Sequence, residues 1–264
     1  MFAMALVRRQ SVVLVGLLTA ALTGWLFLAW AVMDMANPLA RLMMPLSATW
    51  DVPTATAVFA MWSIMMAAMM LPSAAPMVLL FAHLARRGGD WAATWVFVGA
   101  YVLMWVGFSL LAAVTHWALQ AAGLLSSMMV SVDPLLTAVL LIVAGAFQFT
   151  PIKTACLTRC RSPVSFLMTE WRKGRGGAFV MGMRHGMYCI GCCWALMSLL
   201  FVIGVMNLPM VAMVAIAVAL EKLAPKGVWI ARVIGGVLVF GGVWMLFGET
   251  GMPSHGMASF GKVG

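Results

Sequence analysis

The sequence has little charge, and least of all negative charge. Only 9% of its 264 residues are charged, and seven acidic residues stand against 16 lysines and arginines. A soluble domain carries about 25% charged residues. The longest polar segment, at about 154–177, is too short to build a core of its own. The composition therefore excludes a soluble globular protein and indicates an integral membrane protein.

Several nucleotide-binding and catalytic motifs are also absent. The sequence contains no Walker-type glycine loop, no dinucleotide-binding fingerprint and no Gly-x-Ser-x-Gly nucleophile elbow. The chain alone therefore cannot hydrolyse ATP, and nothing in it predicts an enzyme that acts on its own. The net charge of +9 follows from basic loops beside an anionic membrane surface, so it does not predict nucleic-acid binding.

What the sequence does contain is long apolar runs. Hydrophobic residues make up 64% of the chain and the mean hydropathy is +1.05. Seven runs approach or exceed the ~20 residues that a membrane span needs: about 11–33, 54–82, 91–119, 133–152, 178–205, 209–223 and 228–247. We expect an all-α, polytopic transmembrane bundle of about seven helices in a single domain. The run 209–223 is short, so in a six-span alternative it is a re-entrant or tilted piece.

The basic residues predict the orientation of the chain. In a seven-span arrangement, 13 of the 16 fall on one side, which the positive-inside rule makes the cytoplasm: Arg8, Arg9, Arg86, Arg87, Lys153, Arg159, Arg161, Arg172, Lys173, Arg175, Lys222, Lys226 and Arg232. Arg41 and Lys262 fall on the other side, and Arg184 lies within the fifth span. We therefore expect a cytoplasmic N-terminus and a cytoplasmic loop at 154–177.

The fifth run contains a dense set of soft metal ligands. An imidazole, three thiols and a thioether lie within thirteen residues: His185, Cys189, Cys192, Cys193 and Met197. Such groups bind Cu(I) and Zn(II). At spacings of three and four residues, several of them share one face of a helix. The alternative is that the cysteines only pack as small hydrophobes. We interpret the spacing as a metal or redox site, and leave open which of Cys192 and Cys193 faces inward.

A methionine stripe lies on the second run. Met61, Met65 and Met69 recur every four residues, in a chain that has 26 methionines. Pro72 follows closely, and the backbone irregularity that a proline causes inside a membrane requires surrounding protein or a cavity. Packing is the alternative for such a stripe. At ~1.5 Å per residue, Met61 and Met65 reach the depth of Cys189, which predicts one mid-membrane site if the two helices touch.

Two further features lie toward the cytoplasmic side. Cys156 and Cys160 stand four residues apart among arginines, which stabilise thiolates, so they predict an entry or exit point for a metal. Palmitoylated or inert thiols are the alternative. Arg184 needs a carboxylate partner inside the membrane or must extend to the interface. Glu221 lies at a comparable depth, so we predict an Arg184–Glu221 ion pair.

Several stretches resemble the motifs of a known family. They are Met-Met-Ala-Ala-Met-Met-Leu-Pro-Ser-Ala-Ala-Pro-Met (65–77), Cys-Leu-Thr-Arg-Cys-Arg-Ser-Pro (156–163), Met-Arg-His-Gly-Met-Tyr-Cys-Ile-Gly-Cys-Cys-Trp-Ala-Leu-Met (183–197) and Glu-Lys-Leu-Ala-Pro (221–225). They are similar to those of an uncharacterised bacterial family of predicted metal-binding integral membrane proteins, which carry a domain of unknown function. The resemblance covers about 55–245. It implies a multi-pass protein of the bacterial inner (plasma) membrane that binds a metal, and implies no particular activity.

These features together predict a membrane protein that binds a soft metal through a Cys/His/Met cluster. Copper as Cu(I) is the expected ion and zinc is the alternative. The expected partners are the lipid bilayer, the metal ion, and a membrane or periplasmic protein that receives the ion. Two other functions stay open. One is a membrane oxidoreductase, or a subunit of one, that uses the same cluster, and the other is a structural or assembly subunit without chemistry at the site.

Overall fold

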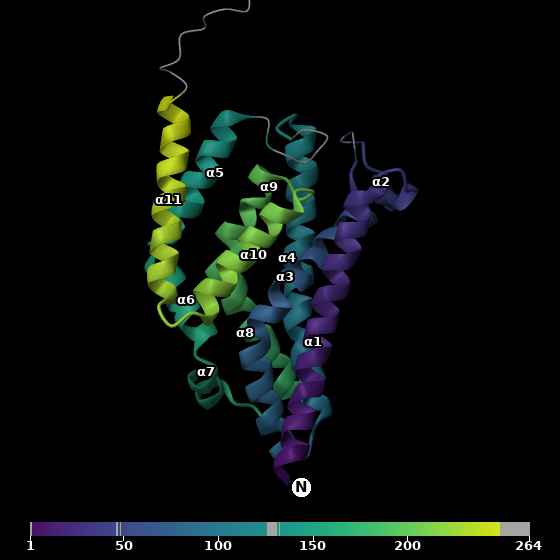
Figure 1. The fold of residues 1–264 in the computed structure, drawn as a ribbon, viewed down its shortest axis with the longest axis vertical. Coiled ribbons are helices and arrows are strands. Elements are labelled where there is room, and N and C mark those ends of the chain that lie inside the picture. Colours follow the sequence, from purple (N-terminus) through teal and green to yellow (C-terminus); the bar gives the residue numbers. More distant parts are fainter. Residues whose placement is uncertain (1, 46, 48, 126–130, 132, 249–264) are drawn as a thin grey trace, which may run out of the picture.

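The computed structural model describes residues 2–45, 47, 49–125, 131 and 133–248. Within these residues every regular element is a helix, apart from one isolated bridge between Leu125 and Ser131, which confirms the all-α prediction. The helices run largely along the long axis of the molecule, with the N-terminus at the lower end of the view (Figure 1).

Four long helices make up most of the bundle: α1 (Phe2–Met33), α3 (Val52–Arg87), α4 (Ala92–Ala121) and α8 (Gly174–Ser198). At the left of Figure 1, α5 and α11 form a separate pair, and α10 crosses between this pair and the rest: α5 (Pro134–Phe147), α10 (Leu208–Leu223) and α11 (Gly227–Gly248). Four short helices complete the fold: α2 (Pro38–Met43), α6 (Pro151–Arg161), α7 (Pro163–Glu170) and α9 (Leu200–Ile203). Helix α3 packs against α1, α4 and α10, while α8 packs against α4 and α6.

Proline and short polar side chains determine where many of these helices begin. The helices α2, α3, α5, α6, α7 and α10 each have a proline in the first turn, where the missing N–H group is not needed. A capping side chain precedes several of them. Asp51 accepts a hydrogen bond from the amide of Thr54, and Thr150 accepts one from the amide of Lys153. The Thr150–Pro151 pair therefore starts α6 as a helix of its own.

The number of helices that could cross a membrane differs from the prediction. Among the described residues, five helices are long and apolar enough to do so, or six if the pair α5 and α6 counts as one span, and this pair is bent by 64°. The prediction of seven is not supported. The sixth run forms α10, whose 16 residues are fewer than the ~20 that a span requires. The fourth run ends at Phe147, and the segment predicted as the loop 154–177 contains most of α6 and all of α7.

Glycines allow two pairs of helices to approach closely. A Cβ atom added to Gly182 of α8 would lie 2.3 Å from the carbonyl oxygen of Phe97 on α4, and one added to Gly186 would lie 2.7 Å from Met104. On the other side, a Cβ atom added to Gly145 of α5 would lie 2.7 Å from the carbonyl oxygen of Gly235 on α11. Small residues at four-residue spacing are typical of helix contacts in membranes, where close backbone packing replaces hydrophobic burial as the driving force.

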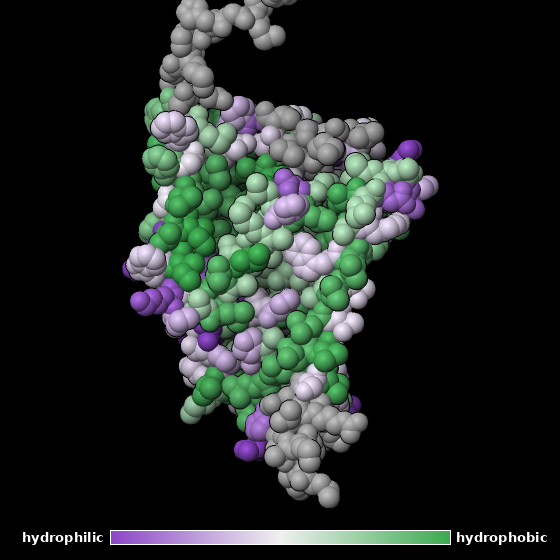
Figure 2. Space-filling view, in the orientation of Figure 1, coloured by the Kyte–Doolittle hydropathy of each residue, from purple (hydrophilic) through white to green (hydrophobic). Residues whose placement is uncertain are grey.

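The outer surface of the bundle is apolar. Figure 2 shows hydrophobic side chains along α11 and α1, the two helices at the margins of this face. On α11, Val237, Phe240, Trp244 and Phe247 are each more than 60% exposed. An apolar surface of this length suits a lipid environment and would be unfavourable in water. The most completely buried large side chains belong instead to α3 and α4, which form the centre of the bundle.

Candidate metal centre

All five cysteines are free thiols and lie on two helices that pack together. Cys189, Cys192 and Cys193 on α8 are buried, and Cys156 and Cys160 on α6 are half-buried. Helix α6 lies against α8, so that Cys160 interacts with both Cys189 and Cys192. We call Cys160, Cys189, Cys192 and Cys193 the thiol cluster. The bend between α5 and α6 turns α6 back to the bundle. Cys156 and Cys160, which we predicted to lie apart toward the cytoplasmic side, are thereby brought next to the cysteines of α8.

Cys156 lies at the edge of the thiol cluster. A Cβ atom added to Gly191 of α8 would lie 2.9 Å from the sulfur of Cys156, so this glycine leaves room for the thiol. Within α8, the thiols of Cys192 and Cys193 both donate to the carbonyl oxygen of Cys189, at 3.1 and 3.0 Å. Both side chains are buried, and the thiol of Cys192 also interacts with that of Cys160.

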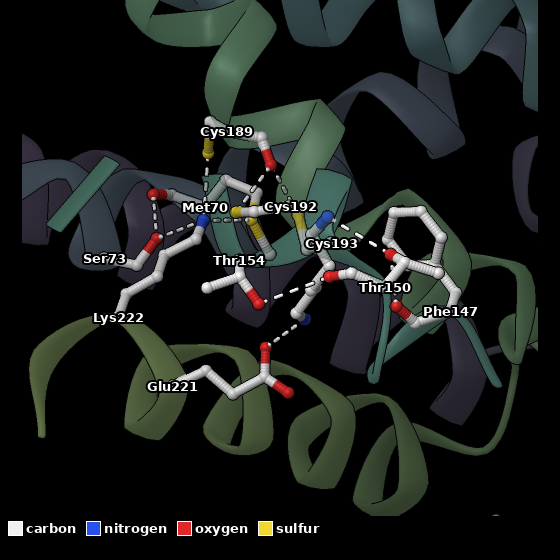
Figure 3. Close-up of polar contacts among 11 residues, drawn as sticks. Met70, Ser73, Phe147, Thr150, Thr154, Cys189, Cys192, Cys193, Glu221 and Lys222 are labelled. Carbon is white, nitrogen blue, oxygen red and sulfur yellow. Dashed lines mark hydrogen bonds and ion pairs between the residues drawn. The ribbon is translucent and has the colours of Figure 1, made fainter. Parts of the chain in front are cut away.

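A lysine amine lies beside the thiol cluster. The Nζ atom of Lys222, on α10, is 2.9 Å from the sulfur of Cys189 and 3.6 Å from the sulfur of Met70. It also donates to the hydroxyl of Ser73 at 3.3 Å. Figure 3 shows the Lys222 side chain extending from α10 toward Cys189, with Met70 and Ser73 close to its amine. The thiolate, rather than the thiol, is the form that binds metals, and a neighbouring cation stabilises the thiolate.

A tyrosine hydroxyl contacts the same sulfur from α4. The hydroxyl of Tyr101 is 3.1 Å from the sulfur of Cys189 and donates to the carbonyl oxygen of Met70 at 3.2 Å. The hydroxyl of Ser73 donates to that same carbonyl oxygen at 2.9 Å. Cys189 is therefore held by two side chains from two other helices, and α3 contributes both a thioether and a main-chain acceptor. Such neighbours of a metal ligand orient it and tune its affinity.

The methionine that meets the thiol cluster is Met70, which the predicted stripe did not contain. Met61, Met65 and Met69 are buried on the same helix, α3. At ~1.5 Å per residue, Met61 lies about 13 Å along the helix axis from Met70. Metal–sulfur bonds are only about 2.3 Å long, so Met61 cannot share an ion with a ligand at the level of Met70. Met197 is likewise buried but lies two turns beyond Cys189 on α8.

His185 lies in a cage of aromatic rings one turn before Cys189. Its ring stacks on those of Tyr101 and Phe97 and meets the edge of Phe166, with ring centres 5.4, 6.0 and 5.7 Å apart. Its two ring nitrogens are buried and have no hydrogen-bond partner. Burying an imidazole without hydrogen-bond partners costs free energy. Both ring nitrogens of His185 are thus available to bind a ligand next to the thiol cluster.

The ion pairs differ from the predicted Arg184–Glu221 pair. Arg184 donates instead to the carboxylate of Glu170, at the end of α7. Glu221 pairs with Lys153 of α6, with 2.5 Å between Nζ and Oε2, and both side chains are almost completely buried. The reason is the bend after α5, which carries Lys153 into the bundle opposite α10. Consecutive residues of α10 therefore contact two different helices: Glu221 contacts α6 and Lys222 contacts α8.

The comparison with family models decides the relationship of the chain. A family model described as PpoB2, copper chaperone, matches residues 59–245. The chain belongs to this copper chaperone family. The matched segment contains α4, α6, α8 and α10 and most of α3, and thus every residue of the thiol cluster together with Met70, Tyr101 and Lys222. No curated protein and no solved structure matches the chain.

The thiol cluster of this copper chaperone family member is not a finished metal cage. Among the described residues, no three side chains of the types His, Cys, Asp and Glu converge closely enough to hold a metal ion. The sulfur of Cys189 faces the amine of Lys222, and the thiols of Cys192 and Cys193 face a main-chain carbonyl. Thiols that donate to a carbonyl must give up their protons and this hydrogen bond before they can bind an ion as thiolates.

Three residues of the site were not found from the sequence: Tyr101, Lys222 and Met70. One signal for Lys222 was present, because Glu221 and Lys222 are adjacent ionisable residues at the end of an apolar run, and such residues in membrane segments are usually functional. For Met70, the spacing of Met66, Met70 and Ser73 by four and three residues marks an alternative face of α3. Nothing in the sequence indicated Tyr101, since its contact with Cys189 depends on how α4 packs against α8.

Proposed function

We propose that this protein is an integral membrane copper chaperone that holds Cu(I) at the thiol cluster and delivers it to another membrane or periplasmic protein. The observation that carries the proposal is the placement of the Cys160 thiol of α6 beside the Cys189 and Cys192 thiols of α8, near the thioether of Met70. The family match supports copper as the ion. Soft thiolate and thioether ligands select Cu(I) over hard cations such as Mg²⁺ and Ca²⁺.

The donor set fits a monovalent soft ion. In our proposal the ligands are the thiolates of Cys160, Cys189 and Cys192, with Met70 as a weaker fourth donor. Cys193 and His185 are additional side chains that can coordinate the ion, because both are buried within about one helical turn of Cys189. The half-buried Cys156 stands at the edge of the cluster, where a partner's ligand could take over the ion by exchange of one thiolate at a time.

The surroundings of the site support a location within a lipid bilayer. Five helices are long and apolar enough to cross a membrane, and the outer faces of α1 and α11 are apolar. We propose a multi-pass arrangement in the bacterial inner membrane with the N-terminus in the cytoplasm, as the distribution of arginine and lysine favours. In this arrangement the end of α10 with Lys222, the adjacent Lys226 and the α6–α7 segment all lie toward the cytoplasmic side.

The experiment that tests the proposal is a count of copper in the purified protein. The chain is purified anaerobically in mild detergent without a polyhistidine tag, loaded with Cu(I), freed of excess ion, and measured by mass spectrometry of the elements. We expect about one copper per chain. The double variant Cys189→Ser/Cys192→Ser should lose it, whereas Met187→Leu, at an exposed position of the same helix, should keep it.

Three outcomes would contradict the proposal. Copper content that is unchanged in the double variant would show that the ion binds elsewhere. Absence of copper from the loaded wild-type protein, with a helical circular dichroism spectrum and a monodisperse elution profile, would make the thiols packing or redox groups. One zinc per chain under competition with equal Cu(I) would contradict the choice of ion and favour a closed tetrahedral site.

A further inference from the structure

We propose that the ammonium group of Lys222 is a resident counter-cation of the thiol cluster, and that Cu(I) displaces it from Cys189 and Met70 to the surface beside α10. The inference rests on the proposed function and deepens it, because it names the group that must leave before the ion can enter.

The position of the amine carries the first step. The Nζ atom of Lys222 lies 2.9 Å from the sulfur of Cys189 and 3.6 Å from that of Met70. These are two of the soft donor atoms that would bind the ion. A metal ion that binds these sulfurs must approach each to about 2.3 Å, and the amine that contacts both sulfurs stands in the way and repels the ion by its charge. The same position cannot hold both cations (Figure 3).

The neighbouring lysine shows that this arrangement is specific to Lys222. Lys153 is also buried, but its amine pairs with the carboxylate of Glu221 at 2.5 Å. Its charge is balanced by a carboxylate, which a soft ion does not compete for. Lys222 faces a sulfur and a hydroxyl instead. Of the two buried lysines, Lys222 is therefore the one that loses its charge partner when a metal takes the thiolate.

The end of α10 gives the displaced amine a short way out. Lys222 is the last residue but one of α10, and Leu223 and Lys226 next to it are exposed. Long lysine side chains can keep their stems in an apolar region while the amine reaches water. The turn that follows stays anchored, because the guanidinium of Arg161 donates to the carbonyl oxygens of Ala224 and Pro225. The side chain can thus move without release of the α10–α11 turn.

The test measures how readily each lysine amine is acetylated in the folded protein. Wild-type protein in lipid nanodiscs, with and without one Cu(I) per chain, is treated briefly with N-hydroxysuccinimidyl acetate and analysed by peptide mass spectrometry. We expect the rate at Lys222 to rise at least fivefold on Cu(I) loading. Lys226, which is exposed, and Lys153, which is buried and paired, are internal controls and should keep their rates.

Three outcomes would overturn the inference. Lys222 that stays protected in a sample with one copper per chain would overturn it and leave the proposed function intact. A parallel rise at Lys153 would show that the whole interior opens, without selective displacement of Lys222. A wild-type sample that takes up no copper would overturn the proposed function and the inference with it, and the copper count of the same sample separates this case from the first.

A variant provides an independent check. The test at the neighbouring lysine is Lys226→Leu, which removes an exposed amine and should leave both the copper count and the Cu(I)-dependent rise in acetylation at Lys222 unchanged. Loss of that rise in Lys226→Leu would show that the reactivity of Lys222 reports on the α10–α11 turn and would overturn displacement.

Discussion

The hydroxyl of Tyr101 lies 3.1 Å from the sulfur of Cys189 and 3.2 Å from the carbonyl oxygen of Met70. A single side chain of α4 therefore connects the thiol cluster on α8 with the thioether segment of α3. Tyr101 is almost completely buried, and the side chains around it leave its hydroxyl these two contacts on facing helices. The relative position of Cys189 and Met70 consequently depends on a group that is itself no metal ligand.

Replacement of this tyrosine should weaken copper binding without unfolding the protein. Tyr101→Phe keeps the ring that stacks on His185 and removes the hydroxyl. Loss of a group that orients a ligand typically costs 10- to 100-fold in metal affinity, so we expect about a tenfold loss. Competition with a coloured Cu(I) chelator measures it. The chain's other tyrosine provides the control: Tyr188→Phe removes a contact with the exposed Arg159 and should change the affinity less than threefold. Equal effects of both variants would contradict a role for the Tyr101 hydroxyl.

The two cysteines of α6 should respond differently to copper. Both are half-buried, so both should be alkylated by N-ethylmaleimide before the three thiols of α8. Because Cys160 contacts Cys189 and Cys192 while Cys156 lies at the edge, Cu(I) loading should protect Cys160 and leave Cys156 reactive. Peptide mass spectrometry after a short alkylation measures both in one sample. Protection of Cys156 alone would place the ion outside the proposed ligand set.

The buried pair of Lys153 and Glu221 should be important for stability as a pair. Lys153→Met leaves the Glu221 carboxylate buried without its partner, which typically costs about 3–5 kcal/mol. The double variant Lys153→Met/Glu221→Leu should recover most of this loss, because no unpaired charge remains. Unfolding in detergent, followed by circular dichroism, measures the difference.

The pair of Arg175 and Asp90 is the matched control for this prediction. Its arginine is 66% exposed, and an exposed ion pair contributes about 0–1 kcal/mol. Arg175→Met should therefore change the free energy of unfolding far less than Lys153→Met. A Lys153→Met variant as stable as Arg175→Met would mean that water reaches Glu221.

One methyl group at the contact of α4 and α8 should disturb the bundle. In Gly182→Ala the new Cβ would lie 2.3 Å from the carbonyl oxygen of Phe97, a main-chain atom that cannot turn away. Such overpacking typically costs 1–3 kcal/mol, and copper affinity should fall as well because Tyr101 moves with α4. Gly99→Ala is the control, since nothing lies within 4 Å of a Cβ there. It should be neutral or stabilise the helix by up to about 1 kcal/mol.

Much of this architecture follows from the sequence because composition and spacing act locally. The apolar runs specify the long helices, and the four-residue spacing of His185 and Cys189 correctly placed both on one buried face of α8. The run 133–152 was interpreted as one straight span, although Thr150 and Pro151 together form a helix start. That turn moves Lys153, Cys156 and Cys160 from a supposed loop to the side of α8.

The remaining differences depend on contacts between helices, which periodicity does not determine. The depth assigned to the methionines was counted from the ends of apolar runs, yet α3 has 36 residues and extends beyond its run at both ends. Met70 therefore replaces Met61 and Met65 at the level of Cys189. The pairing of Glu221 with Lys153 depends on the bend before α6, which the apolar run does not reveal. The partner of Arg184 on α7 could not be found without knowing that the segment after α6 is helical.

The pairing of α5 with α11 has a consequence for synthesis of the protein. Their glycine contacts join segments at residues 134–147 and 227–248, with all of α6 to α10 between them. At 5–20 residues per second, α5 leaves the ribosome on the order of ten seconds before its partner begins to follow. During that interval its glycine face must be covered by lipid or by the insertion machinery. A copper ion that arrived before α11 was made would meet the thiol cluster in a half-assembled bundle. The order of translation thus makes all five cysteines available before the α5–α11 contact can form.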